Sequence, residues 1–164
     1  ATAIAEYVGG SEEAFVNMMN RRAQELMANG THFMNPHGLH DDNHYTTAYD
    51  LYLIFNECIK HEDFVNIIQS EAYTAYYTDV DGNSQEALIT PTNLYAQGEV
   101  DVPENATIVG GKTGTTDEAG YCLILMEKDS SDNPYISIVM GASEKPVLYE
   151  DMTSLIEAIP SGQQ

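Results

Sequence analysis

One short stretch of the sequence combines residue types that can bind a carboxylate group. Residues 110–116 read GGKTGTT, so that glycines flank a lysine followed by threonines. The ammonium group of Lys112 offers a fixed positive charge, and the hydroxyl groups of Thr113 and Thr115 can donate hydrogen bonds to a carboxylate. A glycine such as Gly114 lets a ligand approach a strand closely. The pattern indicates an anion-recognition strand. The alternative is an edge strand that a lysine protects against aggregation.

A histidine-rich segment is the competing candidate for chemistry. His37, His40 and His44 lie close in the sequence to Asp41 and Asp42. Imidazole and carboxylate groups are good ligands for zinc, copper or nickel. The spacing H-x-x-H-x-x-x-H falls, however, in a stretch without helical or strand periodicity, which offers no rigid scaffold for a metal. We therefore expect neither a metal ion nor another cofactor, and we keep a metal-binding loop domain as a weaker alternative.

The composition excludes several classes of protein. The chain has 164 residues, of which 26 are acidic and 6 are basic, and its formal net charge is −20. Binding to a nucleic-acid backbone or to anionic lipid needs a basic face, so we expect no nucleic-acid partner. The hydrophobic content of 43% and the length suit one folded domain. No apolar run reaches the ~20 residues of a membrane-spanning helix. Cys58 and Cys122 are too few for a disulfide framework, and we expect both to be buried small hydrophobic residues.

Residues 1–70 are predicted to form a helical region that is interrupted by the histidine-rich loop at 31–45. Ser11 and Thr47 are residue types that cap helix N-termini well, and each precedes a segment with helical spacing of apolar residues. The first segment, ATAIAEYV, lacks the cationic start of a signal peptide, and we expect its helix to begin upstream. The expected helices cover 1–8, 12–28, 47–59 and 61–70.

From residue 71 the pattern changes to the alternation that is typical of β-strands. Residues 71–105 are predicted to form a hairpin and a connection, and residues 146–160 a C-terminal helix. Residues 106–144 are predicted to form an antiparallel meander that carries the Lys-Thr-Gly sequence, because the links between its strands are short. The expected strands of the meander are 107–115, 120–127 and 135–141.

The predicted hairpin is rich in tyrosine. Its turn is expected at residues 81–83, which read DGN, and a polar connection is expected over 91–105. Tyr73, Tyr76 and Tyr77 are expected to pack on a sheet, because no basic residues interleave with them as in a nucleic-acid stacking platform.

The segments THFMNPHGL, HYTTAYDL and KTGTT occur in this order along the chain. Lys-Thr-Gly is one of three motifs of the penicillin-binding enzymes, and the combination resembles one family among them, the low-molecular-mass D-alanyl-D-alanine carboxypeptidases. The resemblance covers nearly the whole chain. It implies one partial domain over residues 1–164 with an α+β, partial β-lactamase/transpeptidase-like fold, in which N-terminal helices precede a three-stranded antiparallel sheet and a C-terminal helix.

Two motifs of this family are missing from the sequence. The nucleophile of the family lies in a Ser-x-x-Lys motif, and no Ser-x-x-Lys occurs in the 164 residues. The Ser-x-Asn motif that should shortly precede Ala1 is also absent. Residues 131–133 spell Ser-Asp-Asn but follow the Lys-Thr-Gly strand, so we interpret them as a hairpin turn. The chain thus resembles the C-terminal half of such an enzyme, and we expect no hydrolase activity from it alone.

The resemblance also implies residue roles. The absent serine attacks the penultimate peptide carbonyl of a D-Ala-D-Ala stem peptide, and D-alanine leaves as an acyl-enzyme forms. Lys112 supplies positive charge near the terminal carboxylate, to which the hydroxyl groups of Thr113 and Thr115 donate hydrogen bonds. The backbone N–H of Thr115 gives half of the oxyanion hole. Lys112 and Thr115 are therefore the implied catalytic residues, and Gly114 completes the implied substrate-binding segment.

The histidine-rich loop receives a structural role from the same resemblance. His37 and Gly38 would shape a loop near the catalytic cleft, whereas His40 and His44 would face solvent.

The resemblance finally implies partners and a location. The complete enzyme would act on the peptidoglycan stem peptide, bind β-lactams and work outside the cytoplasm, in the cell envelope. The strand at 135–141 would form an exposed hydrophobic edge that pairs with the missing N-terminal half or with a second copy. Two alternatives stay open, namely a non-catalytic module that binds D-Ala-terminated peptides or another carboxylate ligand through Lys112, and a fragment of a serine β-lactamase.

Overall fold

The computed structural model of the protein describes residues 1–160. A helical first part is followed by two separate sheets, with a short helix between them and a longer helix after them. In chain order the elements are α1 (Thr2–Gly9), α2 (Glu12–Glu25), α3 (Ala48–Cys58), α4 (Glu62–Ile68), β1 (Tyr73–Thr78), β2 (Ser84–Ile89), α5 (Leu94–Gln97), β3 (Ala106–Thr116), β4 (Gly120–Asp129), β5 (Pro134–Ala142) and α6 (Lys145–Glu157).

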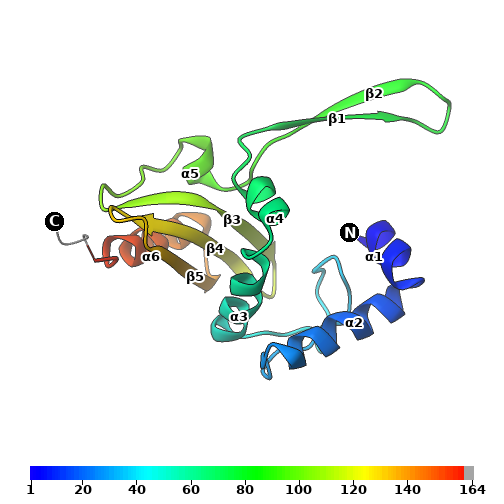
Figure 1. Ribbon diagram of the computed structural model, residues 1–164, viewed down its shortest axis with the longest axis horizontal. Coiled ribbons are helices and arrows are strands. Elements are labelled where there is room, and N and C mark those ends of the chain that lie inside the picture. Colours follow the sequence, from blue (N-terminus) through cyan, green and yellow to red (C-terminus); the bar gives the residue numbers. More distant parts are fainter. Residues whose placement is uncertain (161–164) are drawn as a thin grey trace.

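The larger sheet is antiparallel, with the strand order β3-β4-β5, and it lies between two layers of helices. Helix α6 packs against β4 and β5 on one face, whereas α4 contacts β3 and α3 contacts β5 on the other (Figure 1). Within residues 1–160, β3 and β5 each have one edge without a neighbouring strand. The predicted α+β class, with its three-stranded antiparallel sheet and C-terminal helix, is confirmed.

The hydrophobic core lies between the larger sheet and α6. Successive residues of a strand point to opposite faces, and every second residue of β4 from Leu123 is buried. Leu123 and Leu125 meet Leu148, Met152 and Ile156 of α6, which recur at helical spacing. Full burial of each such side chain stabilises the fold by about 1.5–3 kcal/mol. This core fixes the position of β4. The backbone hydrogen bonds between β4 and β3 then fix the position of β3.

A short helix, α5, docks the connection between the two sheets onto α6. The side chain of Asn93 caps α5 by accepting from Tyr95 N at 3.1 Å, and Gly98 ends it at a φ of 71°. The hydroxyl of Tyr149 accepts from Leu94 N at 2.9 Å, and the rings of Tyr95 and Tyr149 meet edge to face. The prediction of a polar connection over 91–105 therefore missed a packed helical turn, although an N-capping residue and a terminating glycine were present in the sequence.

The smaller sheet is the hairpin β1–β2, which projects away from the larger sheet (Figure 1). Its predicted turn is confirmed, since Gly82 adopts a φ of 86° there. The prediction that its tyrosines pack on a sheet is wrong, because Tyr73 is 65% exposed, Tyr76 77% and Tyr77 53%. A two-stranded ribbon has no second layer to cover both of its faces, so alternation alone does not bury them.

One aspartate closes each hairpin turn. Asp79 accepts hydrogen bonds from the backbone N–H groups of Asp81 and Asn83 in the β1–β2 turn. Asp129 accepts from the N–H groups of Ser131 and Asn133 in the β4–β5 turn. These and further hydrogen bonds, led by that from the Asn133 side chain, lower the pKa of Asp129. The interpretation of residues 131–133 as hairpin chemistry is confirmed, and residue 132 takes a φ of 64°.

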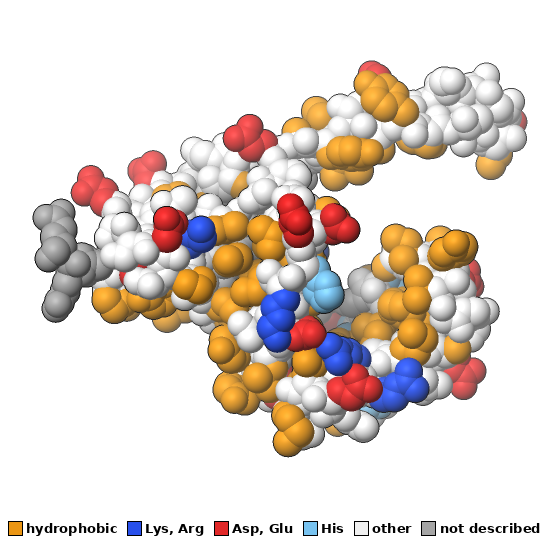
Figure 2. Space-filling model, viewed as in Figure 1, with side chains coloured by type: hydrophobic (Ala, Val, Ile, Leu, Met, Phe, Trp, Pro, Cys, Tyr) orange, Lys and Arg blue, Asp and Glu red, His pale blue; other side chains and the backbone are white. Residues whose placement is uncertain are grey.

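Helices α1 and α2 pack on each other at some distance from the larger sheet. Ser11 caps α2 by accepting from Ala14 N at 3.1 Å, as predicted, but α2 ends at Glu25 rather than at residue 28. Figure 2 shows a hollow between this pair and the hairpin, bordered by hydrophobic side chains on both sides.

Within residues 1–160, no helix combines the length and hydrophobicity needed to span a bilayer.

Both cysteines are half-buried free thiols, so the prediction that they are buried small hydrophobic residues is wrong. Burial is the main reason why the pKa of the Cys58 thiol is raised, which favours its neutral form.

Glu127 is a buried carboxyl group on the core face of β4, in the same alternating set as Leu123 and Leu125. Its side chain is fully buried, and neither carboxyl oxygen has a hydrogen-bond partner among the described residues. Burial raises the pKa of Glu127 from 4.5 to about 7, and the neighbouring Ser137 offsets part of this effect. The folded protein therefore holds an extra proton in its core below neutral pH.

Glu127→Gln is expected to remove a pH-dependent loss of stability. The carboxyl group titrates near 4.5 in the unfolded chain and near about 7 in the folded chain, so the folded state binds more protons between these values. The free energy of unfolding should fall, by on the order of 3 kcal/mol, as the pH rises through this window, and change no further above it. Urea unfolding at several pH values between about 5 and 8 measures this slope.

The control is Glu150→Gln, at an exposed position of α6, which should keep the slope of the parent chain. A slope that persists unchanged in the Glu127 variant would contradict the prediction.

Candidate functional site

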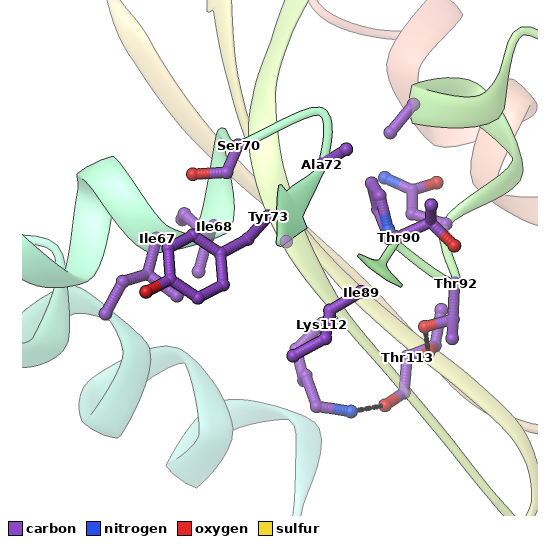
Figure 3. A pocket seen from close by; sticks show the side chains of 14 residues that line it. Ile67, Ile68, Ser70, Ala72, Tyr73, Ile89, Thr90, Thr92, Lys112 and Thr113 are labelled. Atoms are coloured by element: carbon purple, nitrogen blue, oxygen red, sulfur yellow. Dashed lines mark hydrogen bonds between the residues drawn. The ribbon is translucent and has the colours of Figure 1, made fainter. Parts of the chain in front are cut away.

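Strand β3 carries the predicted anion-recognition residues along the outer edge of the larger sheet. Lys112 pairs with Ile124 and Thr115 with Tyr121 in the β3–β4 ladder. The Lys112 side chain is exposed, and its ammonium group donates a hydrogen bond to the backbone oxygen of Thr113 (Figure 3). Thr115 and Gly114 are also exposed, whereas Thr113 is half-buried. The ammonium is therefore held against the strand at the start of the motif.

A pocket of about 650 Å³ adjoins Lys112, and we call it the Lys112 pocket. It lies between α4, the base of the β1–β2 hairpin and β3, and most of its wall is apolar. Figure 3 shows the side chains that line it, among them Ile67 and Tyr73 on one side and Lys112 with Thr113 on another. Lys112 is the single charged residue of this lining, as far as the described part of the chain goes. The wall is completed by Ile68, Ser70, Ala72, Ile89, Thr90, Pro91, Thr92, Asn93, Ala96 and Gly111.

Thr92 is a site residue that the sequence did not reveal. Its Oγ1 lies 2.5 Å from Oγ1 of Thr113, so that the two hydroxyl groups share a hydrogen bond. This contact ties the segment after β2 to the Lys-Thr-Gly strand. It joins residues 21 positions apart, and no local spacing signals such a pair. The orientation of the Thr113 hydroxyl is therefore set by Thr92.

Two glycines let other backbone segments touch β3 directly. A Cβ atom at Gly110 would lie 2.3 Å from the carbonyl oxygen of Ile68, the last residue of α4. A Cβ atom at Gly111 would lie 2.1 Å from the carbonyl oxygen of Ile124 in β4. At Gly114, by contrast, a Cβ atom would meet nothing within 4 Å. The first two glycines are thus required for packing, and the third leaves open space beside the strand.

The histidine-rich loop is anchored to the helices on both of its sides. Asn20 of α2 exchanges two hydrogen bonds of 2.8 Å with the backbone of Phe33. The hydroxyl of Thr31 donates to the buried carboxylate of Asp50, at 2.7 Å, near the start of α3. Residues 32 and 45 pair as an isolated antiparallel bridge. The loop is therefore an ordered structure closed at its base.

The structure brings one histidine of the loop to the turn that follows β3. Nδ1 of His40 lies 3.8 Å from a carboxylate oxygen of Glu118 in the β3–β4 turn, and Nε2 lies 3.2 Å from Asp42. His37 instead lies 3.7 Å from Glu12 at the start of α2, and Gly38 turns the loop with a φ of 79°. Neither His37 nor Gly38 belongs to the lining of the Lys112 pocket.

Both His40 and His44 were predicted to face solvent. The prediction is confirmed for His40, which is exposed, and wrong for His44. His44 is half-buried, and its Nδ1 accepts a hydrogen bond of 3.1 Å from Met34 N. Burial is the main cause that lowers the pKa of His44. Within residues 1–160, no group of three or more His, Cys, Asp and Glu side chains is arranged to hold a metal ion.

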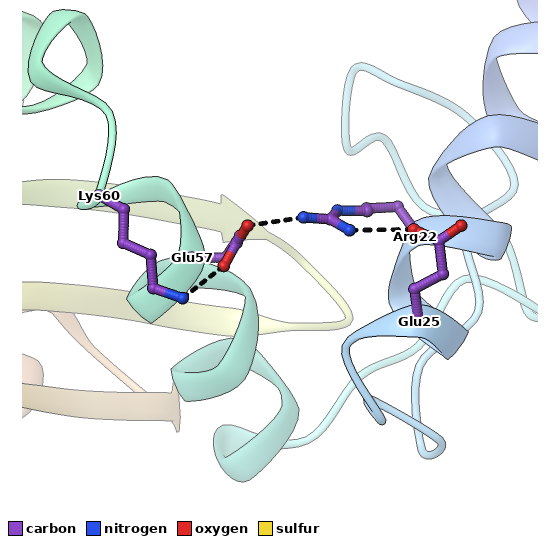
Figure 4. Close-up of polar contacts among 4 residues, drawn as sticks. All are labelled: Arg22, Glu25, Glu57 and Lys60. Atoms are coloured by element: carbon purple, nitrogen blue, oxygen red, sulfur yellow. Dashed lines mark hydrogen bonds and ion pairs between the residues drawn. The ribbon is translucent and has the colours of Figure 1, made fainter.

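An exposed ion-pair chain connects α2 to α3 (Figure 4). The guanidinium of Arg22 contacts Glu25 at 2.9 Å and Glu57 at 2.6 Å, and the ammonium of Lys60 contacts Glu57 at 2.7 Å. The hydrogen bond from Lys60 is the leading cause that lowers the pKa of Glu57. Exposed pairs of this kind contribute little stability, and the pair of Arg22 with Glu57 is a direct side-chain link between α2 and the last turn of α3.

Comparison with known proteins relates this arrangement to one family. Residues 1–144 match the family model for D-alanyl-D-alanine carboxypeptidases, peptidase family S11. The chain is 32% identical over 159 residues to the D-alanyl-D-alanine carboxypeptidase DacF of Bacillus subtilis (strain 168), covering 96% of the chain and 38% of that relative. It is 29% identical over 156 residues to DacC of Escherichia coli (strain K12), covering 94% of the chain and 35% of that relative.

Solved structures extend this likeness to the fold. A Streptomyces DD-transpeptidase superposes with a TM-score of 0.78 at 25% identity, covering 88% of the chain and 53% of that structure. The D-alanyl-D-alanine carboxypeptidase DacD from Francisella tularensis superposes with a TM-score of 0.79 at 24% identity, covering 95% of the chain and 47% of that structure. The chain thus spans less than two fifths of the curated relatives above and about half of these solved structures.

Gly110→Ala is expected to destabilise the chain by about 1–3 kcal/mol, because the added methyl group forces α4 away from β3. Gly114→Ala is the matched control, and it should change the free energy of unfolding by no more than about 0.5 kcal/mol, because its methyl group enters open space. Urea unfolding of the two variants makes the comparison. Equal midpoints would contradict the assigned contact.

Proposed function

The chain belongs to the D-alanyl-D-alanine carboxypeptidase family, peptidase family S11, and we propose that it forms the carboxylate-binding part of an enzyme that removes D-alanine from peptidoglycan stem peptides. The observation that carries this proposal is the Lys112 pocket, in which a single ammonium group lies at the edge of β3 beside a mainly apolar cavity. A carboxylate is the group that such a site complements in charge and in hydrogen bonding.

The proposed reaction divides the roles between this chain and an upstream serine. The serine oxygen attacks the carbonyl between the last two D-alanines, the C–N bond breaks, and D-alanine leaves with a proton on its nitrogen. Water then cleaves the acyl-enzyme. Lys112 attracts the terminal carboxylate, Thr113 and Thr115 donate hydrogen bonds to it, and the N–H of Thr115 stabilises the oxyanion.

The remaining segments support this site in the proposal. Gly114 gives the substrate backbone room to approach β3, in line with the open space beside it. His37 and Gly38 shape the loop near the cleft, and residues 1–164 act as one partial domain. The complete enzyme works in the cell envelope and also binds β-lactams.

A second candidate is a non-catalytic module that binds D-Ala-terminated peptides through the same pocket. It is favoured by one observation, which is that the Lys112 pocket by itself combines an ammonium group with a mainly apolar cavity. A fragment of a serine β-lactamase is a third candidate. Rates of the complete protein on a penicillin and on a D-Ala-D-Ala peptide separate the two enzymes, and saturable peptide binding without turnover identifies the module.

We propose in addition that the outer edge of β5 is a pairing surface. It joins the upstream part of the polypeptide in the complete enzyme, and a second copy when the chain is alone. Residues 135–138 border an open groove of about 440 Å³ together with Tyr52 and Leu155, and the edge itself has no neighbouring strand within residues 1–160. An unpaired apolar edge of this kind favours strand addition.

The 164-residue chain is expected to form no covalent adduct with a labelled penicillin, because it lacks the nucleophile. Mass spectrometry after incubation measures this, and a stoichiometric adduct would overturn the expectation.

In the complete protein, Lys112→Met should lower kcat/KM on a D-Ala-D-Ala peptide by about 10–100-fold, the effect of losing a charge-assisted hydrogen bond. Lys145→Met, an exposed position at the start of α6, should leave the rate unchanged.

The isolated chain is expected to dimerise through β5, and Met140→Lys at its exposed edge should weaken the dimer by about tenfold or more. Analytical ultracentrifugation gives both dissociation constants. Met18→Lys in α2 is the matched control, since Met18 is 38% exposed and Met140 39%. A parent chain that stays monomeric at high concentration would argue against the pairing surface.

A further inference from the structure

The hydroxyl group of Thr92 lies against the strand that carries the proposed carboxylate-binding residues. Resting on the proposed function, we infer that Thr92 is a positioning residue. It donates its hydrogen to Thr113 and so leaves the single hydroxyl hydrogen of Thr113 free for the terminal carboxylate of the substrate. The Oγ1 atoms of the two threonines are 2.5 Å apart, and both residues line the Lys112 pocket (Figure 3).

The direction of this hydrogen bond follows from counting hydrogens. A hydroxyl group has one hydrogen to donate and two lone pairs that accept. In the chain alone, either hydroxyl can be the donor of the bond between Thr92 and Thr113. Once Thr113 donates to a carboxylate, its only hydrogen is used, so the bond between the threonines is kept only if Thr92 donates. A bound carboxylate therefore sets two hydrogen bonds in line, from Thr92 to Thr113 and from Thr113 to the ligand, and each polarises the other.

Hydrogen bonds on both sides hold the backbone of Thr92 in place. The carbonyl oxygen of Pro91 accepts from the side chain of Gln97 at 2.7 Å. The side chain of Asn93 is buried and accepts from Tyr95 N at 3.1 Å, which caps α5. Tyr95 in turn belongs to the hydrophobic core that includes α6. A hydroxyl group that extends from such a fixed segment can hold its partner in one orientation.

The backbone of Thr113 is held as well. Thr113 pairs with Leu123 in the β3–β4 ladder, and Leu123 is buried in the core. The ammonium group of Lys112 donates a hydrogen bond to the backbone oxygen of Thr113. The freedom that remains to Thr113 is therefore the rotation of its side chain and of its hydroxyl hydrogen. The contact with Thr92 restricts this rotation.

The effect on binding is expected to depend on the charge of the ligand. A hydrogen bond to a charged acceptor is roughly twice as strong as one between neutral groups. A hydroxyl donor that Thr92 holds in place is therefore worth more to a carboxylate than to a carboxamide. A general loosening of the segment around Thr92 would weaken both kinds of ligand by the same factor. The ratio between the two ligands thus separates positioning of the donor from mere support of the segment.

The test uses the complete protein and two peptides, acetyl-lysyl-D-Ala-D-Ala with a free terminal carboxylate and the same peptide with a terminal carboxamide. Initial rates of release of the last residue give KM and kcat, and calorimetry gives the dissociation constants if neither peptide is cleaved. Thr92→Val replaces the hydroxyl group by a methyl group. It should raise the KM or the dissociation constant of the acid by about 3–10-fold, and that of the amide by less than about twofold.

Two further variants serve as controls. Thr92→Ser keeps the hydroxyl group and should restore the values of the parent protein. Thr78→Val makes the same chemical change at an exposed position at the far end of β1, and it should leave both peptides unaffected. Circular dichroism of the variants verifies that they fold.

A double-mutant cycle tests whether Thr92 acts through Thr113. In a Thr113→Val background, Thr92→Val should weaken binding of the acid no further, because the donor that Thr92 orients is gone. A further loss in this background would mean that Thr92 contacts the ligand itself, and it would overturn the positioning role.

The remaining outcomes also decide the inference. An unchanged ratio of acid to amide in the Thr92→Val protein would overturn it, while D-alanine release by the parent protein still upheld the proposed function. The expected change in the ratio of dissociation constants, without any D-alanine release, would uphold the inference and defeat the proposed enzyme. Absence of binding by both peptides would defeat both.

Discussion

Direct contact between backbones on both sides of β3 is the constraint on which the site depends. At Gly110 the strand touches the last carbonyl of α4, and at Gly111 it touches a carbonyl of β4, with no room for a side chain at either place. The strand is therefore clamped one residue before Lys112. At Gly114, by contrast, the strand faces open space. The backbone is thus held in place just before Lys112 and is accessible two residues after it. The side chain of Lys112 therefore extends from a fixed stretch of backbone.

The charge around Lys112 differs from the charge of the chain as a whole. The chain carries a net charge of −20, yet the cavity beside β3 contains no acidic residue among the described residues that line it. Long-range repulsion of anions by the whole surface is opposed locally by the exposed ammonium group of Lys112, which lies at the edge of a mainly apolar cavity. A ligand with a single negative end and a neutral body fits both conditions. A polyanion would be repelled by the net charge of −20 along its whole length.

Local signals made much of the fold predictable, and long-range contacts set the limit. The strand predicted at 107–115 is β3 (Ala106–Thr116), and Ser11 caps α2 as expected, because alternation and capping are properties of neighbouring residues. The exposure of Tyr73 was not predictable, since periodicity indicates a strand but not what covers it. The hydrogen bond between Thr92 and Thr113 joins segments that are distant in the sequence, so local spacing could not predict it. The burial of Glu127 was not predictable either, because a charged residue type at a core position of β4 contradicts the expected alternation of apolar and polar residues.

The β1–β2 ribbon has a mechanical consequence for the cavity at its base. It is a two-stranded structure that extends outward from its attachment beside α4, and a ribbon of this kind has little intrinsic stability. Tyr73 and Ile89 at its root are also wall residues of the cavity, so bending of the free arm changes the width of the cavity mouth. The turn closed by Asp79 lies at the opposite end of the same two strands, so the turn and the cavity wall belong to one continuous ribbon.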